Sequence, residues 1–159
     1  MKKNCFLFLS LLLCQIPWVF GQEYQWAKRA GSAGTEKIEK LVTDSQGNVY
    51  VTGWFRVITF GTLSITASGS FVDAFVAKFD SLGNVCWLRR GGGPGNDFSY
   101  DIALDEAGNL YITGQISAGG PADFGSFSLT NAGQADVFVA KYDTAGTCLW
   151  AKSAGGNFD

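Results

Sequence analysis

The chain has 159 residues and a formal net charge of −2, and 47% of its residues are apolar while only 16% are charged. This balance excludes a disordered tail and a solvated coiled coil. The sequence holds no histidine, which excludes any site that needs an imidazole base or an imidazole zinc ligand. Twenty-one glycines against three prolines, together with 13 Phe, 5 Tyr and 5 Trp, favour many short strands joined by tight turns.

The N-terminus has the pattern of an export signal. Lys2 and Lys3 precede the apolar run at 6–13, and small or modest residues lead to Gly21. We expect residues 1–21 to be a signal peptide cleaved after Gly21, which predicts a secreted or cell-surface protein. The apolar run is too short for a transmembrane segment, which needs about 20 residues.

An alternative for this end is a lipoprotein signal. Residues 11–14 end in Cys14 and resemble a lipobox, although Leu13 stands where that motif has a small residue. Without residues 1–21 the chain keeps 10 basic and 14 acidic side chains. The resulting negative charge gives no reason to expect nucleic acid as a partner.

Two segments repeat along the chain. Residues 44–53 recur at 105–114, and residues 73–80 recur at 136–143. Each unit carries four strand-like runs, and we expect a leading strand at 24–29 of the same type as the last run of each unit. In the second unit the runs are 101–104, 110–116, 137–142 and 148–152.

Short turns of the form Asp-x-x-Gly-x join the first run to the second and the third to the fourth. They are typical of a type I turn closed by a left-handed glycine, so we expect positive φ at Gly47, Gly83, Gly108 and Gly146. A calcium loop needs carboxylates at alternating positions and a distant Glu. Both are missing here, so no metal site is predicted.

Two cysteines remain after export, Cys86 and Cys148. Cys86 stands one residue before Trp87, whereas Cys148 stands two before Trp150. In strands this offset turns the two side chains to opposite faces. We therefore predict buried free thiols and no disulfide.

The third run of the second unit, 137–142, is apolar on both faces, as in a sheet covered on both sides. Covered four-stranded sheets that repeat along a chain are typical of β-propeller blades. The run Asp-x-x-Gly-Asn-x-Tyr-x-Thr-Gly, then Phe-Gly, Asp-x-Phe-Val-Ala-Lys and Trp-x-Lys or Trp-x-Arg resembles the SBBP-type β-propeller repeat of bacterial secreted and surface proteins.

The predicted fold class is therefore all-β, with four-stranded antiparallel blades in an incomplete ring. We expect blade 1 at about 37–90, blade 2 at about 97–152 and the start of a third blade at 153–159. A closed propeller needs roughly four to eight blades. We therefore expect a fragment whose open ends meet further blades of a longer parent chain, or one that self-associates.

The longer segments at 56–72, 89–100 and 117–135 are expected on the rim opposite the short turns, where a binding face would lie. The candidate contacts for a carbohydrate or protein ligand on or near this rim are Trp54, Arg56, Arg89, Arg90, Asp97, Asp101 and Asp123. Trp54 could stack on a sugar ring, and its alternative is packing between blades. Lys78 and Lys141 occur in both units and are interpreted as structural.

No catalytic motif stands out. Residues 91–95 are glycine-rich but lack the Gly-Lys-Ser/Thr ending of a phosphate-binding loop, so an inter-blade turn is predicted. A glycosidase needs two carboxylates about 5 to 10 Å apart, and no such pair is marked. We predict a non-enzymatic adhesion scaffold without a cofactor; the alternatives are a structural spacer and the non-catalytic part of a larger secreted hydrolase.

Overall fold

The computed structural model describes residues 25–31 and 34–157, so the expected signal peptide at 1–21 lies outside the described residues. Every helix or strand assigned in this part of the chain is a β-strand. In chain order the strands are β1 (Glu36–Thr43), β2 (Val49–Phe55), β3 (Val57–Phe60), β4 (Leu63–Thr66), β5 (Asp73–Phe79), β6 (Val85–Gly92), β7 (Phe98–Leu104), β8 (Leu110–Ser117), β9 (Ala122–Phe124), β10 (Phe127–Leu129), β11 (Ala135–Tyr142) and β12 (Cys148–Ala154).

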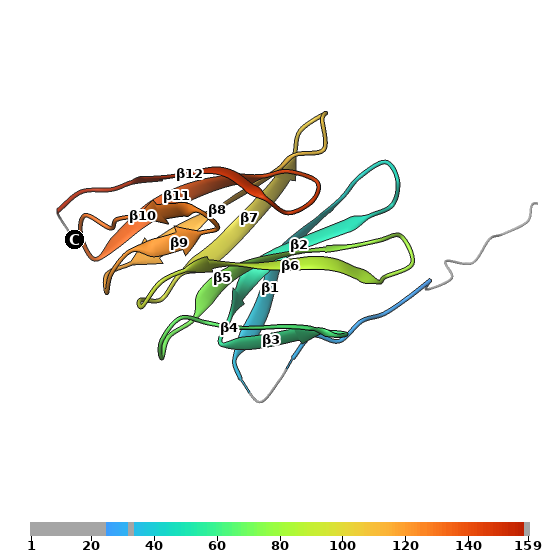
Figure 1. Cartoon of the computed structure of the whole chain (residues 1–159), viewed down its shortest axis with the longest axis horizontal. Helices are drawn as coiled ribbons and strands as arrows, with labels where there is room; N and C mark the ends of the chain where they lie inside the picture. The colour runs from blue at the N-terminus through green and yellow to red at the C-terminus, as the bar shows by residue number, and fades with distance from the viewer. Residues whose placement is uncertain (1–24, 32–33, 158–159) are drawn as a thin grey trace, which may run out of the picture.

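Two four-stranded antiparallel units pack against each other (Figure 1). Blade 1 consists of β1, β2, β5 and β6, and blade 2 of β7, β8, β11 and β12. The short β9–β10 hairpin of blade 2 extends the sheet of blade 1, because β9 pairs with the end of β6 at Gly91 and Gly92. The all-β prediction of incomplete propeller blades is confirmed.

Two features differ from the sequence-based expectation. The segments 56–72 and 117–135 were expected as loops, but each contains a short hairpin, β3–β4 and β9–β10. Phe60 and Phe124 anchor these hairpins, since they are 3% and 0% exposed. Residues 25–29, the described part of the strand expected at 24–29, are assigned to no strand.

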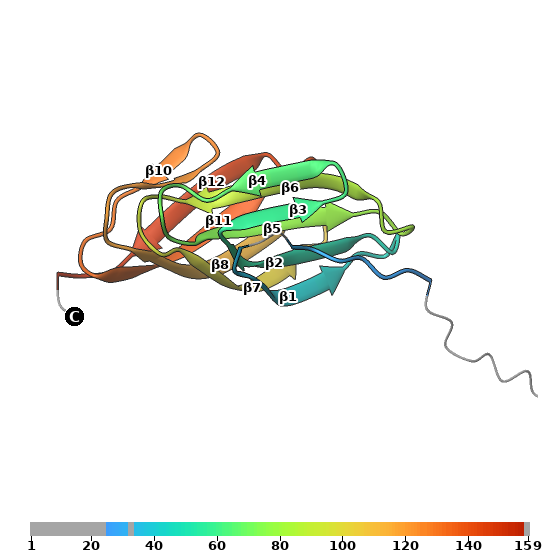
Figure 2. The same ribbon diagram turned by 90° about the horizontal axis from the view of Figure 1, so that it is seen from below.

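The larger apolar core lies between the blades, and a second core lies on the other side of blade 1. Figure 2 shows the β3–β4 hairpin across β5 on this second side. Residues 137–142 were expected to lie in a sheet covered on both sides, and this expectation is wrong for that strand, because no further blade covers its second face among the described residues. The equivalent strand β5 of blade 1 is covered on both faces. In blade 2, β11 buries Phe138 and Ala140 but leaves Val137 and Val139 60% and 38% exposed.

Cys86 and Cys148, the two cysteines among the described residues, are free; Cys86 is exposed and Cys148 is buried. The expectation of two buried thiols is thus wrong for Cys86. The pairing of β5 with β6 passes from Trp87 to Val85, which leaves Cys86 in a β-bulge. A bulged residue is unpaired, and here its side chain is turned toward solvent.

Candidate functional site

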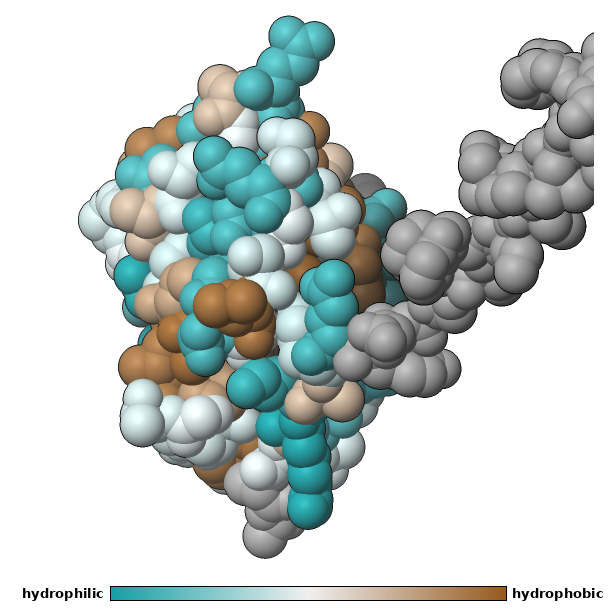
Figure 3. Space-filling view, turned by 90° about the vertical axis from the view of Figure 1, so that its right-hand side faces the viewer, coloured by the Kyte–Doolittle hydropathy of each residue, from teal (hydrophilic) through white to brown (hydrophobic). Residues whose placement is uncertain are grey.

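The four Asp-x-x-Gly turns lie together at the right-hand end of the molecule in Figure 1. Their glycines take the left-handed conformation predicted from the sequence, with φ of 79° at Gly47, 78° at Gly83, 81° at Gly108 and 79° at Gly146. Figure 3 faces this end and shows a mostly hydrophilic surface with small apolar areas.

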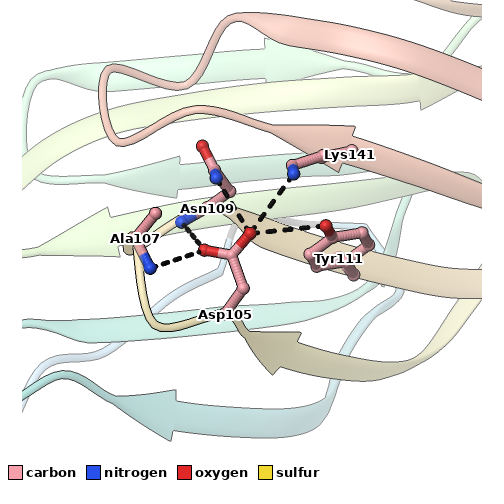
Figure 4. A network of polar contacts seen from close by, with 5 residues as sticks. All are labelled: Asp105, Ala107, Asn109, Tyr111 and Lys141. Atoms are coloured by element: carbon pink, nitrogen blue, oxygen red, sulfur yellow. Dashed lines mark hydrogen bonds and ion pairs between the residues drawn. The ribbon is translucent and has the colours of Figure 1, made fainter.

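The turn at 105–109 shows what its aspartate does (Figure 4). Asp105 Oδ1 accepts hydrogen bonds from the amides of Ala107 and Asn109, at 3.1 and 2.8 Å. Asp105 Oδ2 accepts from Asn109 Nδ2, Tyr111 Oη and Lys141 Nζ, at 2.9, 3.3 and 3.2 Å. The bonds from Asn109, with that of Lys141, lower the pKa of Asp105 to about 2. The donors that meet this carboxylate all come from its own blade, so the turn and Lys141 serve the fold.

The connections at the opposite end form a surface that we call the loop rim, made of residues 67–72, 93–97, 117–121 and 130–135. These segments touch one another closely. A Cβ atom on Gly95 would lie 2.6 Å from the carbonyl oxygen of Ala118, and one on Gly120 would lie 3.2 Å from the ring of Pro94. The rim is therefore one continuous surface built from both blades.

Three buried aspartates hold the rim loops in place. Asp73, Asp97 and Asp136 are 0%, 1% and 3% exposed. Asp73 Oδ2 accepts from the amide of Ser68, and Asp136 Oδ2 accepts from that of Ala132, at 2.8 and 2.9 Å.

Asp97 joins two segments, because it accepts from the amides of Gly93 at 2.6 Å and Ser117 at 3.0 Å. Each carboxylate thus ties a loop to the start of a strand. Asp97 was expected among the ligand contacts. Its burial makes it a residue that positions loops instead.

Asp73 and Asp97 lie close together at the junction between the blades. A Cβ atom on Gly92 would lie 2.8 Å from both Asp73 Cγ and Asp97 Oδ2. Arg90 donates to Asp73 Oδ2 at 2.7 Å and compensates part of the negative charge. Burial raises the pKa of both carboxyl groups, and for Asp73 the negative charge of Asp97 adds to this effect.

The structure brings only part of the predicted site together. Arg90 and Asp97 both lie at the blade junction, where the charge of Arg90 acts on Asp97 without a hydrogen bond between them. Arg56 is exposed beside Ala67, whose amide donates to the carbonyl oxygen of Arg56. Asp123 is exposed in β9. Asp73 was not predicted as a loop-positioning residue; the only signal for it in the sequence is an acidic residue that begins the same apolar run in both units.

The other predicted contacts lie away from the rim loops. Trp54 Nε1 donates to Glu39 at 3.0 Å, and its ring packs edge-on against Phe98 of blade 2 with 5.8 Å between centroids. This geometry matches the inter-blade packing alternative. Asp101 is exposed on β7, and Arg89 points to the turn of blade 2.

Trp87 and Arg89 clamp blade 1 to blade 2. Trp87 Nε1 donates to the carbonyl oxygen of Thr144 at 3.1 Å, and Arg89 Nε donates to that of Gly146 at 2.9 Å. The indole lies directly on Gly146, where a Cβ atom would come within 2.7 Å of Trp87 Cδ2.

Trp26 repeats this arrangement on the turn of blade 1, where Nε1 donates to Ser81 O at 3.2 Å and the ring lies over Gly83. The Trp-x-basic motif is therefore a clamp that grips the Asp-x-x-Gly turn of the following blade.

Residues 25–54 and 87–121 match the family model for the SBBP β-propeller repeat. These two segments are therefore similar to the SBBP β-propeller repeat. Both matches begin at or next to a clamp tryptophan and continue through the first two strands of the following blade. The SBBP repeat therefore spans the boundary between two blades, which is the contact described above.

A relative from Acanthamoeba polyphaga mimivirus, the uncharacterized WD repeat-containing protein L264, is 27% identical over 155 residues. The alignment covers 79% of this chain and 11% of the relative, so the chain spans about a tenth of that protein.

Two kinds of feature are absent from residues 25–31 and 34–157, which the structure describes. No group of three or more acidic, cysteine or histidine side chains there could hold a metal ion. In the same part of the chain, no helical segment has the length and apolar character that a membrane crossing requires.

Proposed function

We propose that these blades form a non-catalytic scaffold in an exported or cell-surface protein, and that the loop rim binds a carbohydrate or a protein ligand. The difference between the two ends of the molecule carries this proposal. The turns at one end repeat the same sequence form and satisfy their aspartates internally. The rim segments differ between the blades, and buried aspartates hold them in defined positions.

The loop rim and its edge also offer suitable contact groups. Phe71 on the rim is 51% exposed although it is aromatic. Arg56 is exposed at the edge of the rim, where its carbonyl oxygen accepts from the amide of Ala67. Exposed aromatic and arginine side chains dominate many binding surfaces. Export rests on the sequence of residues 1–21. N-terminal sequencing of the exported protein should give a start at Gln22, within two residues.

Binding is tested by incubating the labelled mature protein with an array of polysaccharides and a panel of extracellular proteins. Phe71→Ser and Arg56→Ser should each weaken binding about tenfold or more, which corresponds to about 1.4 kcal/mol. Leu82→Ser is the matched control, since Leu82 is 75% exposed at the turn end. Equal losses in all three variants would contradict a rim site, and a lack of any ligand would favour the structural spacer.

A further inference from the structure

One face of blade 2 is open although it carries apolar side chains. We call it the outer face; it consists of Tyr111, Thr113, Val137, Val139, Trp150 and Lys152, on β8, β11 and β12. Val137 and Val139 stand on it at 60% and 38% exposed. Beside Val139 the surface is hollowed by a shallow depression of about 210 Å³, which Asp101 and Tyr111 also line.

The same positions in blade 1 are covered by blade 2. Thr52 is equivalent to Thr113 and is 0% exposed, and it donates across the interface to Ser99 Oγ at 2.7 Å. Four of the other five equivalents are almost fully buried: Tyr50 at 1%, Ala74 at 0%, Val76 at 1% and Trp87 at 6%. The fifth, Arg89, is exposed, but its Nε donates across the interface to the carbonyl oxygen of Gly146. The outer face thus has the residue pattern of a surface that receives a blade.

The complementary half of this interface is exposed on the other side of the molecule. Ser99 and Ile102 of blade 2 are 0% and 5% exposed because they face blade 1. Their equivalents in blade 1 are Ile38 and Leu41, which are 47% and 59% exposed. The contact between two blades is made by two complementary surfaces. One of them is exposed on blade 2, as the outer face, and the other is exposed on blade 1, at Ile38 and Leu41.

We propose that copies of this chain associate head to tail, with the outer face of one copy docked on Ile38 and Leu41 of the next. The two surfaces differ, so the contact is heterologous and can extend or close into a ring. Thr113 would face Ile38 instead of a hydroxyl. The hydroxyl of Thr113 would still have a hydrogen-bond partner, because Thr113 Oγ1 donates to the carbonyl oxygen of Phe138 at 2.8 Å.

The clamp gives the docking a defined register. Trp150 and Lys152 correspond to Trp26 and Lys28, so they would grip the turn at 80–84 of the next copy in place of residues 25–31. That segment is assigned to no strand, and most of its side chains are exposed. Asp80 in this turn already interacts with the charge of Lys28, and Lys152 would supply the same charge.

The mature chain from Gln22 is tested by sedimentation velocity over a wide range of concentration. Wild type should associate reversibly, whereas Val139→Glu on the outer face and Leu41→Glu on the opposite face should each be monomeric. A mixture of these two variants should form a one-to-one dimer and nothing larger, because each keeps one intact face. Val137→Glu repeats the outer-face test, and circular dichroism of each variant verifies the fold.

Phe71→Glu on the loop rim is the control and should associate like wild type. A wild-type monomer at all concentrations would overturn the proposal, and so would a Leu41→Glu variant that still dimerises, since that indicates pairing of two outer faces. Association that Val139→Glu leaves unchanged would also overturn it. Removal of residues 22–31 should strengthen association by freeing the turn at 80–84. Failure of the association proposal would not affect the separate proposal that the loop rim binds a ligand.

Discussion

Replacing Gly146 with alanine tests the clamp between the blades, and Gly108→Ala is its control. Both glycines occupy the same turn position, with φ of 79° and 81°. Alanine in this left-handed conformation costs about 1–2 kcal/mol. The surroundings differ, because a new Cβ atom would lie 2.7 Å from the Trp87 ring at Gly146 but 3.2 Å from a methyl group of Thr144 at Gly108.

The Gly146 variant must therefore also displace Trp87, which is 6% exposed. This displacement weakens the hydrogen bond to Thr144, worth about 1 kcal/mol net. It also disturbs the packing against Tyr50, where ring centroids are 6.2 Å apart, a contact worth about 0.5–1.5 kcal/mol. We expect Gly108→Ala to lower the free energy of unfolding by about 1–2 kcal/mol, and Gly146→Ala to lower it by about 3–4 kcal/mol.

The measurement is urea unfolding followed by tryptophan fluorescence, made in the Val139→Glu background so that association does not contribute. Circular dichroism would show whether each variant keeps its strands. Equal losses for the two glycine variants would refute the reasoning, because the clamp would then add nothing to the strain of the turn.

Three further predictions concern single groups. Thr52→Val should lower the free energy of unfolding by about 1–2 kcal/mol more than Thr113→Val, because only Thr52 bonds across the blades; urea unfolding of both checks this. Cys86 should react quickly with a thiol reagent, and Cys148, whose pKa is raised by burial to about 11, only upon unfolding; equal rates would contradict the assigned burial. Burial raises the pKa of Asp97. The free energy of unfolding should therefore fall as the pH rises from about 4, the ordinary pKa of an aspartate, through the raised pKa of Asp97. Urea unfolding between pH 4 and 7 should show a smaller fall in Asp97→Asn, and an unchanged slope would contradict the assignment.

The four long strands of each blade could be predicted because their signals are local and occur twice. Asp105 and Gly108 mark a turn, and alternating apolar residues mark the strands on either side of it. The hairpin at Phe124 was missed because its strands have only three residues. So short a run shows no alternation, and its pairing with Gly91 is a contact between blades.

The candidate site was harder to predict, since burial depends on how the blades pack. An aspartate at the start of a strand has the same sequence signal whether it faces solvent or a loop amide. Asp97 was thus expected as a ligand contact, and Asp73 was seen only as part of the repeat. Cys86 was expected to be buried because the strand pattern does not reveal a bulge. The bulge turns the Cys86 side chain toward solvent without changing that pattern.

The outer face of blade 2 is equivalent to the face of blade 1 that blade 2 covers, and we infer that it receives a blade in the same way. The most direct test is a longer chain in which residues 91–154 are repeated after Ser153, so that a second copy of blade 2 can cover this face. Urea unfolding should then show one cooperative transition with a larger denaturant slope and a higher free energy of unfolding than the natural chain. Two separate transitions, with the first two blades unfolding as they do alone, would contradict the account.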